Sequence, residues 1–437
     1  MIRVKWVCSK TKKRGIYLPV RFQNNKNANP AKIDFYFGSW QKKLTLRFDH
    51  TLPNDIIGLT DDLKNEVFIP EDVPFDYNIS EREFHVGPMV LWIAANTNER
   101  LNKRLSNLQR RIENYIPVRG MICICAEEGV NLKTKKIEGY YFHPLLNKWE
   151  KATFSYPGAI FKRVHLTPPV NRHLYKWTKG RIFNSYFFNK WEMWDWLSGD
   201  ARIRKHLPYT EKAESLEQVK KMVKRFPSVY MKPMKGSEGR RILQLEQHQD
   251  GIRITDDRKE KTIVSNLEDY ERLLKRLKSS RPYLIQQGVP TKYGSRNIDF
   301  RIYMQKNEKK QWKSSGITAR ISEPDSIITN LRHLDYWVDG REALKEIYKL
   351  SEQKASIQEK KIVNICKRAC SKLDKKGEYG DIAIDFVINK KLHVWILEMN
   401  LRHVYPVEDP RLAPEVKRTP FLYAMSLAGF PHLEKKR

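Results

Sequence analysis

Three oxygen-bearing side chains near the end of the sequence have the types and spacing of a magnesium site. Asp385, Glu398 and Asn400 lie in a segment, 380–400, that reads as a β-hairpin with a polar turn at 389–391. Glu398 and Asn400 are two residues apart and therefore share one strand face. Asp385 joins them, about 7 Å from Glu398 across a diagonal, if the turn holds an even number of residues. Unpaired burial of these groups would be costly, and Mg²⁺ relieves that cost because it takes oxygen ligands and shares them with substrate phosphates.

The same pattern predicts which side chains lie on the opposite, apolar face of the hairpin. These are Ile384, Phe386, Ile388, Trp395, Leu397 and Met399. The simpler alternative is a surface hairpin whose three polar side chains are solvated. A metal that binds a phosphate substrate predicts phosphate-binding elements upstream, so their presence or absence separates the two interpretations.

A lysine followed by a glycine-rich loop could supply such an element. Lys232 ends a predicted strand at 229–232, and Gly236, Ser237 and Gly239 follow it. Glycines let backbone N–H groups turn toward an anion, the hydroxyl adds a donor, and the lysine can reach a phosphate as a point charge. The loop lacks the G-x-x-x-x-G-K-[ST] pattern of a Walker A motif. A basic hairpin turn is the alternative interpretation.

Two further predicted strands carry charged side chains of use in phosphate chemistry. Asp299 and Arg301 share one strand face, and Arg320 lies near the end of a strand at 316–321. An arginine beside a metal and phosphate site stabilises charge that develops during phosphoryl transfer. Ordinary surface strands carry the same residues at these spacings, so neither strand is specific by itself.

Apolar periodicity predicts the elements that must position these residues. Residues 1–80 are predicted to form short strands, including 33–37 and 43–48. Between 81 and 180, a strand, a helix and a strand predict a parallel sheet, with expected bounds 85–93, 98–115 and 121–126. The rest mixes both types: helices at 214–226, 267–277, 341–350 and 358–373, with strands at 229–232, 283–289 and 299–304. The fold class is therefore α/β (α+β), in three parts: 1–80, 81–180 and 181–437.

Length and cysteine usage bound the class of protein. The chain has 437 residues, enough for two or three domains with their own cores. It has no run of about 18 apolar residues, so we expect no membrane span. The N-terminal residues do not have the pattern of a secretory signal, so we expect none. The spacings of Cys123 with Cys125 and of Cys366 with Cys370 fit neither a disulfide framework nor a zinc site. Buried reduced thiols in a cytoplasmic protein are the expectation.

The net charge is +31, from 82 lysines and arginines against 51 acidic residues. A charge of this size attracts polyanions at low salt. The basic residues are spread along the chain without an RNA-recognition or zinc-finger signature, which disfavours nucleic-acid recognition. A lysine-rich solvated surface and affinity for anionic partners, including nucleotide phosphate, an acidic protein or an anionic matrix, both stay open.

Taken in order, these pieces resemble the ATP-grasp fold, and more closely the YheC/YheD-type endospore coat-associated proteins of spore-forming bacteria. The resemblance covers roughly 175–415 and rests on six motifs: Arg181–Trp191, His206–Thr210, the Lys232 strand and loop, Asp299–Met304, Gly316–Ser322 and Glu398–Asn400. Each is modest alone, and six in the same order are specific. The resemblance implies an ATP-grasp domain at 181–437, preceded by a Rossmann-like pre-ATP-grasp domain at 81–180 and a small β-rich module at 1–80.

The resemblance also implies a role for each candidate residue in a site for ATP and Mg²⁺. Lys190 and Lys232 match the lysines that contact ATP phosphates, and the loop with Gly236, Ser237 and Gly239 matches the mobile loop over them. Gln286, Gln287 and Val289 match the hinge that reads adenine, and Asp299 sits where an acidic residue contacts ribose. Arg301 and Arg320 match arginines near the γ-phosphate or acyl-phosphate. Asp385, Glu398 and Asn400 match the magnesium ligands.

The chemistry implied by the resemblance is carboxylate activation. ATP phosphorylates a carboxylate, an amine attacks the acyl-phosphate, and an amide forms with release of ADP and phosphate. The implied setting is the mother-cell cytoplasm, in spore coat or envelope formation, with spore coat proteins as partners. The carboxylate and amine are not identified, and amino acids, short peptides and acidic polymers are the classes to test.

Three departures from the family pattern keep an alternative open. Arg241 stands where a glycine is common, Gln287 stands where a glutamate is frequent, and Arg332 follows Thr329-Asn330-Leu331 where a glycine pair is expected. The last departure lies in the segment that the resemblance assigns to the amine-acceptor pocket. The alternative function is a non-catalytic spore coat protein that retains the fold, and simple polyanion binding is a third class.

Overall fold

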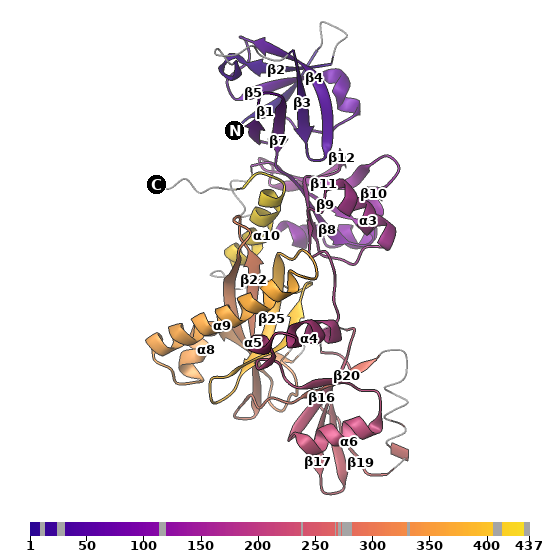
Figure 1. Ribbon diagram of the computed structural model, residues 1–437, viewed down its shortest axis with the longest axis vertical. Coiled ribbons are helices and arrows are strands. Elements are labelled where there is room, and N and C mark those ends of the chain that lie inside the picture. Colours follow the sequence, from indigo (N-terminus) through magenta and orange to yellow (C-terminus); the bar gives the residue numbers. More distant parts are fainter. Residues whose placement is uncertain are drawn as a thin grey trace. The chain divides into compact units, whose positions relative to one another are not determined.

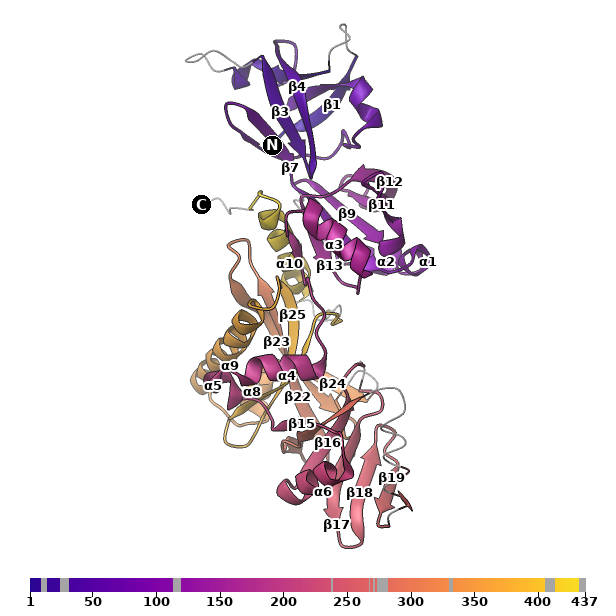
Figure 2. The ribbon, with the colours of Figure 1, turned by 45° about the vertical axis from the view of Figure 1, so that its right-hand side comes forward.

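The computed structural model describes residues 1–8, 14–23, 31–112, 119–236, 239–266, 268–269, 272, 282–329, 333–404 and 413–431. The chain divides into two compact units. Unit 1 comprises 1–185, 306–311 and 404–437, and unit 2 comprises 186–305 and 312–403. Figures 1 and 2 show the ribbon from two directions.

Unit 1 begins with a sheet whose two edge strands are joined. The strand order is β1-β5-β2-β4-β3-β7-β6. The bounds are β1 Arg3–Val7, β2 Gly15–Pro19, β3 Lys32–Phe37, β4 Trp40–Asp49, β5 Ile56–Thr60, β6 Asp76–Ile79 and β7 Glu83–Gly87, with short 3₁₀ turns at Val20–Phe22 and Asp61–Asn65. Ile2, before β1, and Phe75, before β6, exchange backbone hydrogen bonds of 2.8 and 2.7 Å. These bonds pair the sheet's edges with each other, which reduces the number of unpaired backbone groups.

The second sheet of unit 1 is mixed, with the order β10-β11-β9-β8-β13-β14 and β12 paired to β11. The bounds are β8 Met89–Ala95, β9 Met121–Ala126, β10 Val130–Asn131, β11 Lys136–His143, β12 Lys148–Ser155, β13 Ala159–Lys162 and β14 Ile182–Phe183, with a 3₁₀ turn at Glu127–Gly129. Strand β8 pairs in parallel with both β9 and β13. The parallel sheet predicted from the strand, helix and strand order is therefore confirmed.

Two predicted elements of this region differ from the observed ones. The predicted strand at 85–93 is two strands, β7 and β8, that lie in different sheets. Pro88 separates them, and it has no backbone N–H to continue a ladder. The described part of the predicted helix at 98–115 contains two short helices, α1 (Asn98–Asn102) and α2 (Leu105–Gln109), and 113–115 lie outside the described residues.

The break between α1 and α2 leaves the apolar side chains on the core side. The Arg104 N–H bonds Leu101 O, a tight turn that ends the first helix, and Leu108 N–H starts again from Arg104 O. Leu101, Leu108 and Ile112 are all buried. The apolar periodicity therefore predicted correctly which side chains are buried. It could not predict the break in the helix, because the same side chains face the core on both sides of the break.

Helices complete unit 1. Helix α3 spans Pro168–Trp177, and the C-terminal helix α10 spans Ala413–Leu427. Phe421 of α10 meets Trp92 of β8 and Phe161 of β13 edge-on, with ring centroids 5.8 and 6.0 Å apart. The last helix therefore packs on the sheet of unit 1, although the chain between 186 and 403 mostly builds unit 2.

Unit 2 contains an antiparallel sheet in the order β15-β20-β16-β17-β18-β19. The bounds are β15 Thr210–Lys212, β16 Ser228–Pro233, β17 Leu243–His248, β18 Gly251–Asp256, β19 Lys261–Val264 and β20 Tyr283–Gln287. Helix α6 (Leu216–Arg225) lies over this sheet (Figure 2) and buries Val219, Met222 and Val223 against it. The helix predicted at 267–277 falls largely outside the described residues.

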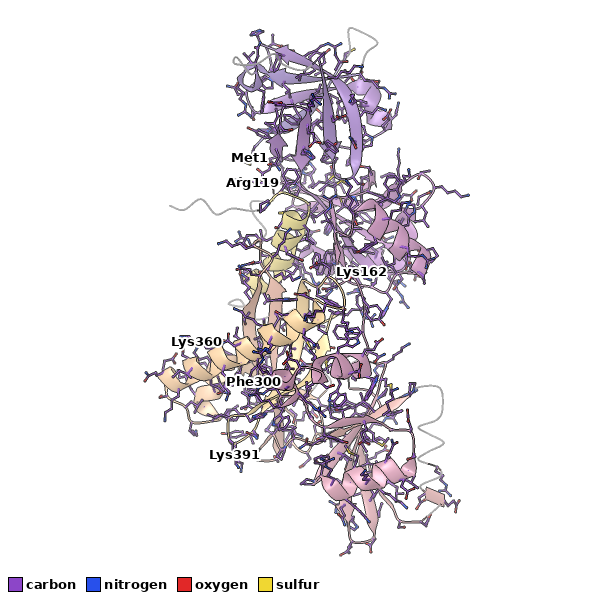
Figure 3. The ribbon with its side chains drawn as sticks, viewed as in Figure 1. Met1, Arg119, Lys162, Phe300, Lys360 and Lys391 are labelled. Atoms are coloured by element: carbon purple, nitrogen blue, oxygen red, sulfur yellow. The ribbon has the colours of Figure 1, made fainter. Side chains whose placement is uncertain are left out.

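The second sheet of unit 2 has the order β24-β23-β22-β25-β26, with β21 paired to β22. The bounds are β21 Lys292–Tyr293, β22 Arg296–Lys306, β23 Trp312–Ser322, β24 Leu334–Asp339, β25 Asp381–Ile388 and β26 Val394–Asn400. The helices are α4 Lys190–Ser198, α5 Ala201–Arg204, α8 Gly340–Glu346 and α9 Glu352–Leu373. Helix α9 packs on this sheet beside β23 (Figure 2), and its buried side chains share one core with Phe300 of β22, which Figure 3 labels.

The β25–β26 hairpin places its apolar face differently from the prediction. Its turn consists of Lys390, Lys391 and Leu392, an odd number, and by itself this would put Asp385 and Glu398 on opposite faces. A register shift between Asp385 and Phe386 leaves one extra residue on β26 and restores the pairing, so Asp385 lies directly opposite Glu398.

Because of this shift, the predicted apolar face of the hairpin is partly wrong. Trp395 and Leu397 were expected on that face, and both are only partly buried. The residues that fill it are Ile384, Phe386, Ile388, Val394, Ile396 and Met399. An extra residue in one strand changes the alternation from that point on, and the sequence pattern does not locate it.

Candidate functional site

Asp385 is the centre of a buried charge network on the second sheet of unit 2. Arg301 of β22 donates two hydrogen bonds to its carboxylate, of 2.7 and 2.8 Å. The Nη2 atom of Arg320, on β23, lies 3.2 Å from Asp385 Oδ1, and the Asn400 amide donates to Oδ2 at 3.2 Å. Burial raises the pKa of Asp385, but the charges of Arg301 and Arg320 outweigh it and hold the pKa at about 2. The carboxylate is therefore charged at neutral pH.

Arg320 joins Asp385 to a second carboxylate, Asp299 of β22. Its Nε and Nη2 atoms donate to the two oxygens of Asp299, at 2.7 and 2.6 Å. The Thr329 hydroxyl donates to Asp299 Oδ2. Arg320 and Asp299 are each about 8% exposed, so this pair is shielded from solvent.

Lys190 connects a third carboxylate to the glycine-rich loop. Its Nζ atom lies 2.9 Å from Glu398 Oε1 and donates to Gly236 O, also at 2.9 Å. Lys190 is the first residue of α4, whose capping box is formed by Asn189 and Glu192. A cation at a helix N-terminus opposes the helix dipole, so the Glu398 charge offsets an arrangement that is unfavourable for the helix alone.

Lys232 projects from β16, the neighbouring strand of β20. Its Nζ atom donates to Gln286 Oε1 at 2.6 Å, and the Gln286 amide donates to Thr210 Oγ1 at 3.1 Å. Burial lowers the pKa of Lys232 to about 8, and nearby Glu398 partly opposes this decrease. A lysine with this pKa is still mostly charged at pH 7, and an anion placed beside it would raise its pKa again.

The predicted hinge, Gln286 to Val289, lies where β20 ends. Tyr209 and Gln287 are bonded twice: Gln287 N–H donates to Tyr209 O at 2.8 Å, and Tyr209 N–H donates to Gln287 Oε1 at 3.2 Å. A Cβ on Gly288 would lie 2.7 Å from the Ser228 carbonyl oxygen, so only glycine fits here without a shift of the backbone. Val289 follows directly and is partly buried.

The glycine-rich loop is described on both sides of Ser237, which lies outside the described residues together with the residue after it. Gly239 has a φ of +65°. Arg241, which stands where the resembling family commonly has glycine, has a φ of +63°. A side chain in this left-handed region is strained, so the observed backbone explains the preference for glycine and marks Arg241 as a departure.

Sequence reasoning found the charged residues of the site but missed the hydroxyls that orient them. Thr329 contacts Asp299, and Thr210 contacts Gln286, across separations of 30 and 76 residues. No local spacing relates residues so far apart. Asn330, which was singled out after Thr329, lies outside the described residues.

The donor set fits a hard cation in its chemistry. Glu398 and Asp385 present carboxylates from paired strand positions, and the Asn400 amide adds an oxygen because its nitrogen is the atom bonded to Asp385. The part of the chain that is described contains no group of three or more histidine, cysteine, aspartate or glutamate side chains that could hold a metal. Asp385 already accepts four hydrogen-bonding contacts, so to bind a cation it must release at least one of its present donors.

Two other sequence expectations concern the chain as a whole. Over the described residues, no helix is both long and apolar enough to cross a membrane. None of the five cysteines forms a disulfide, and Cys123, Cys125, Cys366 and Cys370 are buried. These four side chains therefore pack in the cores.

Comparison with known proteins gives one family and two curated relatives. The model of a family described as YheC/D like ATP-grasp matches residues 179–427, more than half of the chain. The endospore coat-associated protein YheD of Bacillus subtilis (strain 168) is 26% identical over 423 residues, covering 90% of this chain and 88% of the relative. The endospore coat-associated protein YheC of the same organism is 21% identical over 287 residues, covering 61% and 76%.

Among solved structures, the D-alanine-D-alanine ligase from Coxiella burnetii is 10% identical. The match covers 78% of this chain and 95% of that chain, with a TM-score of 0.46.

Replacement of Lys232 by methionine tests whether the buried charge of Lys232 lowers the stability of the folded protein. Because its folded pKa of about 8 lies below the unfolded value of about 10.4, the unfolded state binds more protons between these values. Wild-type stability should therefore rise with pH across this window. Below pH 8, Lys232→Met should be more stable than wild type by about 1 kcal/mol, because the cost of the buried charge exceeds the cost of leaving the Gln286 oxygen without its donor. Chemical denaturation from pH 7 to 10 should show this advantage shrinking.

The matched control is Lys391→Met, the same change at an exposed lysine in the β25–β26 turn (Figure 3). It should not alter stability at any of these pH values. A Lys232→Met protein that is less stable than wild type at pH 7, or whose difference does not vary with pH, would contradict the interpretation.

Proposed function

The chain belongs to the YheC/D like ATP-grasp family, and from this premise we propose that it is an ATP- and Mg²⁺-dependent ligase that joins a carboxylate to an amine. The observation that carries the proposal is the pairing of charges in unit 2. Each cation expected to bind phosphate is held by a carboxylate or amide oxygen: Lys190 by Glu398, Arg301 by Asp385, Arg320 by Asp299 and Asp385, and Lys232 by Gln286.

Such an arrangement suits a ligand that carries both signs of charge. The nucleotide phosphates would bind the four cations in place of their present partners, and Mg²⁺ would be held by Glu398, Asn400 and Asp385. The four cations and the three carboxylates, of Asp299, Asp385 and Glu398, leave one excess positive charge, which favours a magnesium nucleotide of net negative charge. When bound, Mg²⁺ would neutralise part of the phosphate charge.

The residues of this chain would divide the remaining work. Lys190 and Lys232 would hold the phosphates, and backbone atoms from Gln286 to Val289 would face the adenine. The loop that begins at Gly236 would exclude water, which otherwise hydrolyses an acyl-phosphate. Lys190 already bonds the Gly236 carbonyl, so phosphate binding at Lys190 would act on the loop directly.

The proposed reaction has two steps. A carboxylate oxygen of the substrate attacks the γ-phosphorus, the bond from that phosphorus to the bridging oxygen breaks, and ADP leaves. Arg301 and Arg320 stabilise the charge on the transferring phosphoryl group. The amine then attacks the acyl carbon, the bond to the phosphate oxygen breaks, phosphate leaves, and the amine loses a proton to give the amide.

We place this activity in spore coat or envelope formation, in the mother-cell cytoplasm. The support is that both curated relatives are named endospore coat-associated proteins. The net charge of +31 adds a reason to include acidic polymers and acidic peptides among the substrates to test. Spore coat proteins are the proposed partners.

Calorimetric titration with ATP and Mg²⁺ tests the nucleotide site before any substrate is known. Lys232→Met and Glu398→Gln should each weaken binding at least tenfold, because each removes a charge-assisted contact worth about 1.5 to 3 kcal/mol. Lys391→Met should bind as wild type does. Binding that both site variants retain at full strength would contradict the assignment.

Release of ADP tests the ligase reaction itself. With Mg²⁺ and ATP present, amino acids, short peptides and acidic polymers would be supplied singly and in pairs, with Glu398→Gln as the control. One class should raise ADP release by wild type at least tenfold above the level without acceptor, and the control should not respond. Tight ATP binding with no response to any class would instead favour a nucleotide-binding coat protein without catalysis.

A further inference from the structure

Asp299 is the acidic residue expected to contact ribose, yet its carboxylate is turned toward Arg320. Both of its oxygens accept from that guanidinium, at 2.7 and 2.6 Å, and the Thr329 hydroxyl adds a third bond. The residue is 8% exposed. Its orientation and burial therefore serve a partner inside the protein.

The bidentate pair fixes the guanidinium plane of Arg320. Nε and Nη2 are engaged with Asp299, and Nη2 also lies 3.2 Å from Asp385 Oδ1. None of these bonds uses Nη1. A planar guanidinium held along one edge has little freedom to rotate, so its remaining donors point in a defined direction.

The position of Thr329 strengthens this arrangement. Thr329 lies after β23, and its own side chain is buried. It bonds the Asp299 oxygen that accepts from Arg320 Nη2. Asp299 Oδ2 therefore accepts from both Arg320 and Thr329, so the Thr329 hydroxyl helps to fix the carboxylate that orients Arg320.

We propose that Asp299, held by Thr329, is a positioning residue that aims Arg320 at the γ-phosphate and makes no contact with the ribose. This inference rests on the proposed function, since it presupposes that Arg320 meets the phosphates of bound ATP. It differs from the expectation for this position in what the residue recognises. A ribose contact gives affinity for any adenosine nucleotide, and the positioning of Arg320 gives preference for ATP over ADP.

Three nucleotides distinguish the two roles. ATP, ADP and 2′,3′-dideoxy-ATP would be titrated with Mg²⁺ into the full-length wild type and into Asp299→Asn. Positioning predicts that the variant loses at least fivefold of its preference for ATP over ADP. It also predicts that removal of the ribose hydroxyls has the same effect on the affinity of both proteins.

A ribose contact predicts the reverse, and that result would overturn the proposal. The ATP preference would then be unchanged in Asp299→Asn, and the loss caused by removing the ribose hydroxyls would disappear in the variant. A wild type that binds ATP and ADP equally would overturn it as well, because Arg320 would then not read the γ-phosphate. A wild type that binds no nucleotide would instead refute the proposed function.

Thr329 supplies a second test that keeps the Asp299–Arg320 pair in place. Thr329→Val removes only the hydroxyl and should lower the ATP preference at least twofold, and Thr329→Ser should restore it. This pair of variants decides the matter if Asp299→Asn does not fold. An ATP preference that is the same in Thr329→Val as in wild type would overturn the proposed orienting role.

Discussion

The cost of burying like charges is the constraint on which the candidate site depends. Four cations converge in unit 2, and two of them, Arg301 and Arg320, lie on adjacent strands where they would repel each other without Asp385 between them. Lys190, Arg301 and Arg320 are each paired with a carboxylate, and Lys232 is held by the Gln286 amide oxygen. Leaving a buried charge without a partner costs several kcal/mol. The strands β22, β23, β25 and β26 must therefore stay in one register, because a slip of one residue would turn each of these side chains to the opposite face.

Irregular features of the backbone meet this constraint. The extra residue in β26 compensates for an odd turn and returns Glu398 to a position opposite Asp385. The capping box of α4 holds Lys190 at a helix start that a cation alone would destabilise. Gly288 allows β16 to approach the end of β20 closely. These features cost local regularity and position the charges, which is the usual sign that a site, and not fold stability alone, is being served.

Residue type and order along the chain predicted the family, since the family model confirms the ATP-grasp fold of residues 179–427. They also predicted the parallel sheet around β8. They could not predict which side chains contact each other across many residues of sequence. Asp299 accepts from Arg320, 21 residues away, and from Thr329, 30 residues away. The break in the helix at 98–115 was missed because it preserves the apolar spacing. The bulge in β26 was missed because the apolar pattern does not locate the residue at which the alternation changes. The boundaries at residues 80 and 180 stay predictions.

The central claim is that the site consists of preformed ion pairs whose members separate when ligands bind. The nucleotide phosphates then bind the cations, and Mg²⁺ binds the carboxylates. Coupling between the two ligands measures this directly, because each alone would leave one sign of charge in the site unpaired. Calorimetric titration of the full chain with ATP, in excess chelator and in saturating Mg²⁺, should show at least tenfold tighter binding with the metal, and much less enhancement in Asp385→Asn. Equal affinity with and without Mg²⁺, or the same enhancement in the variant, would contradict the account.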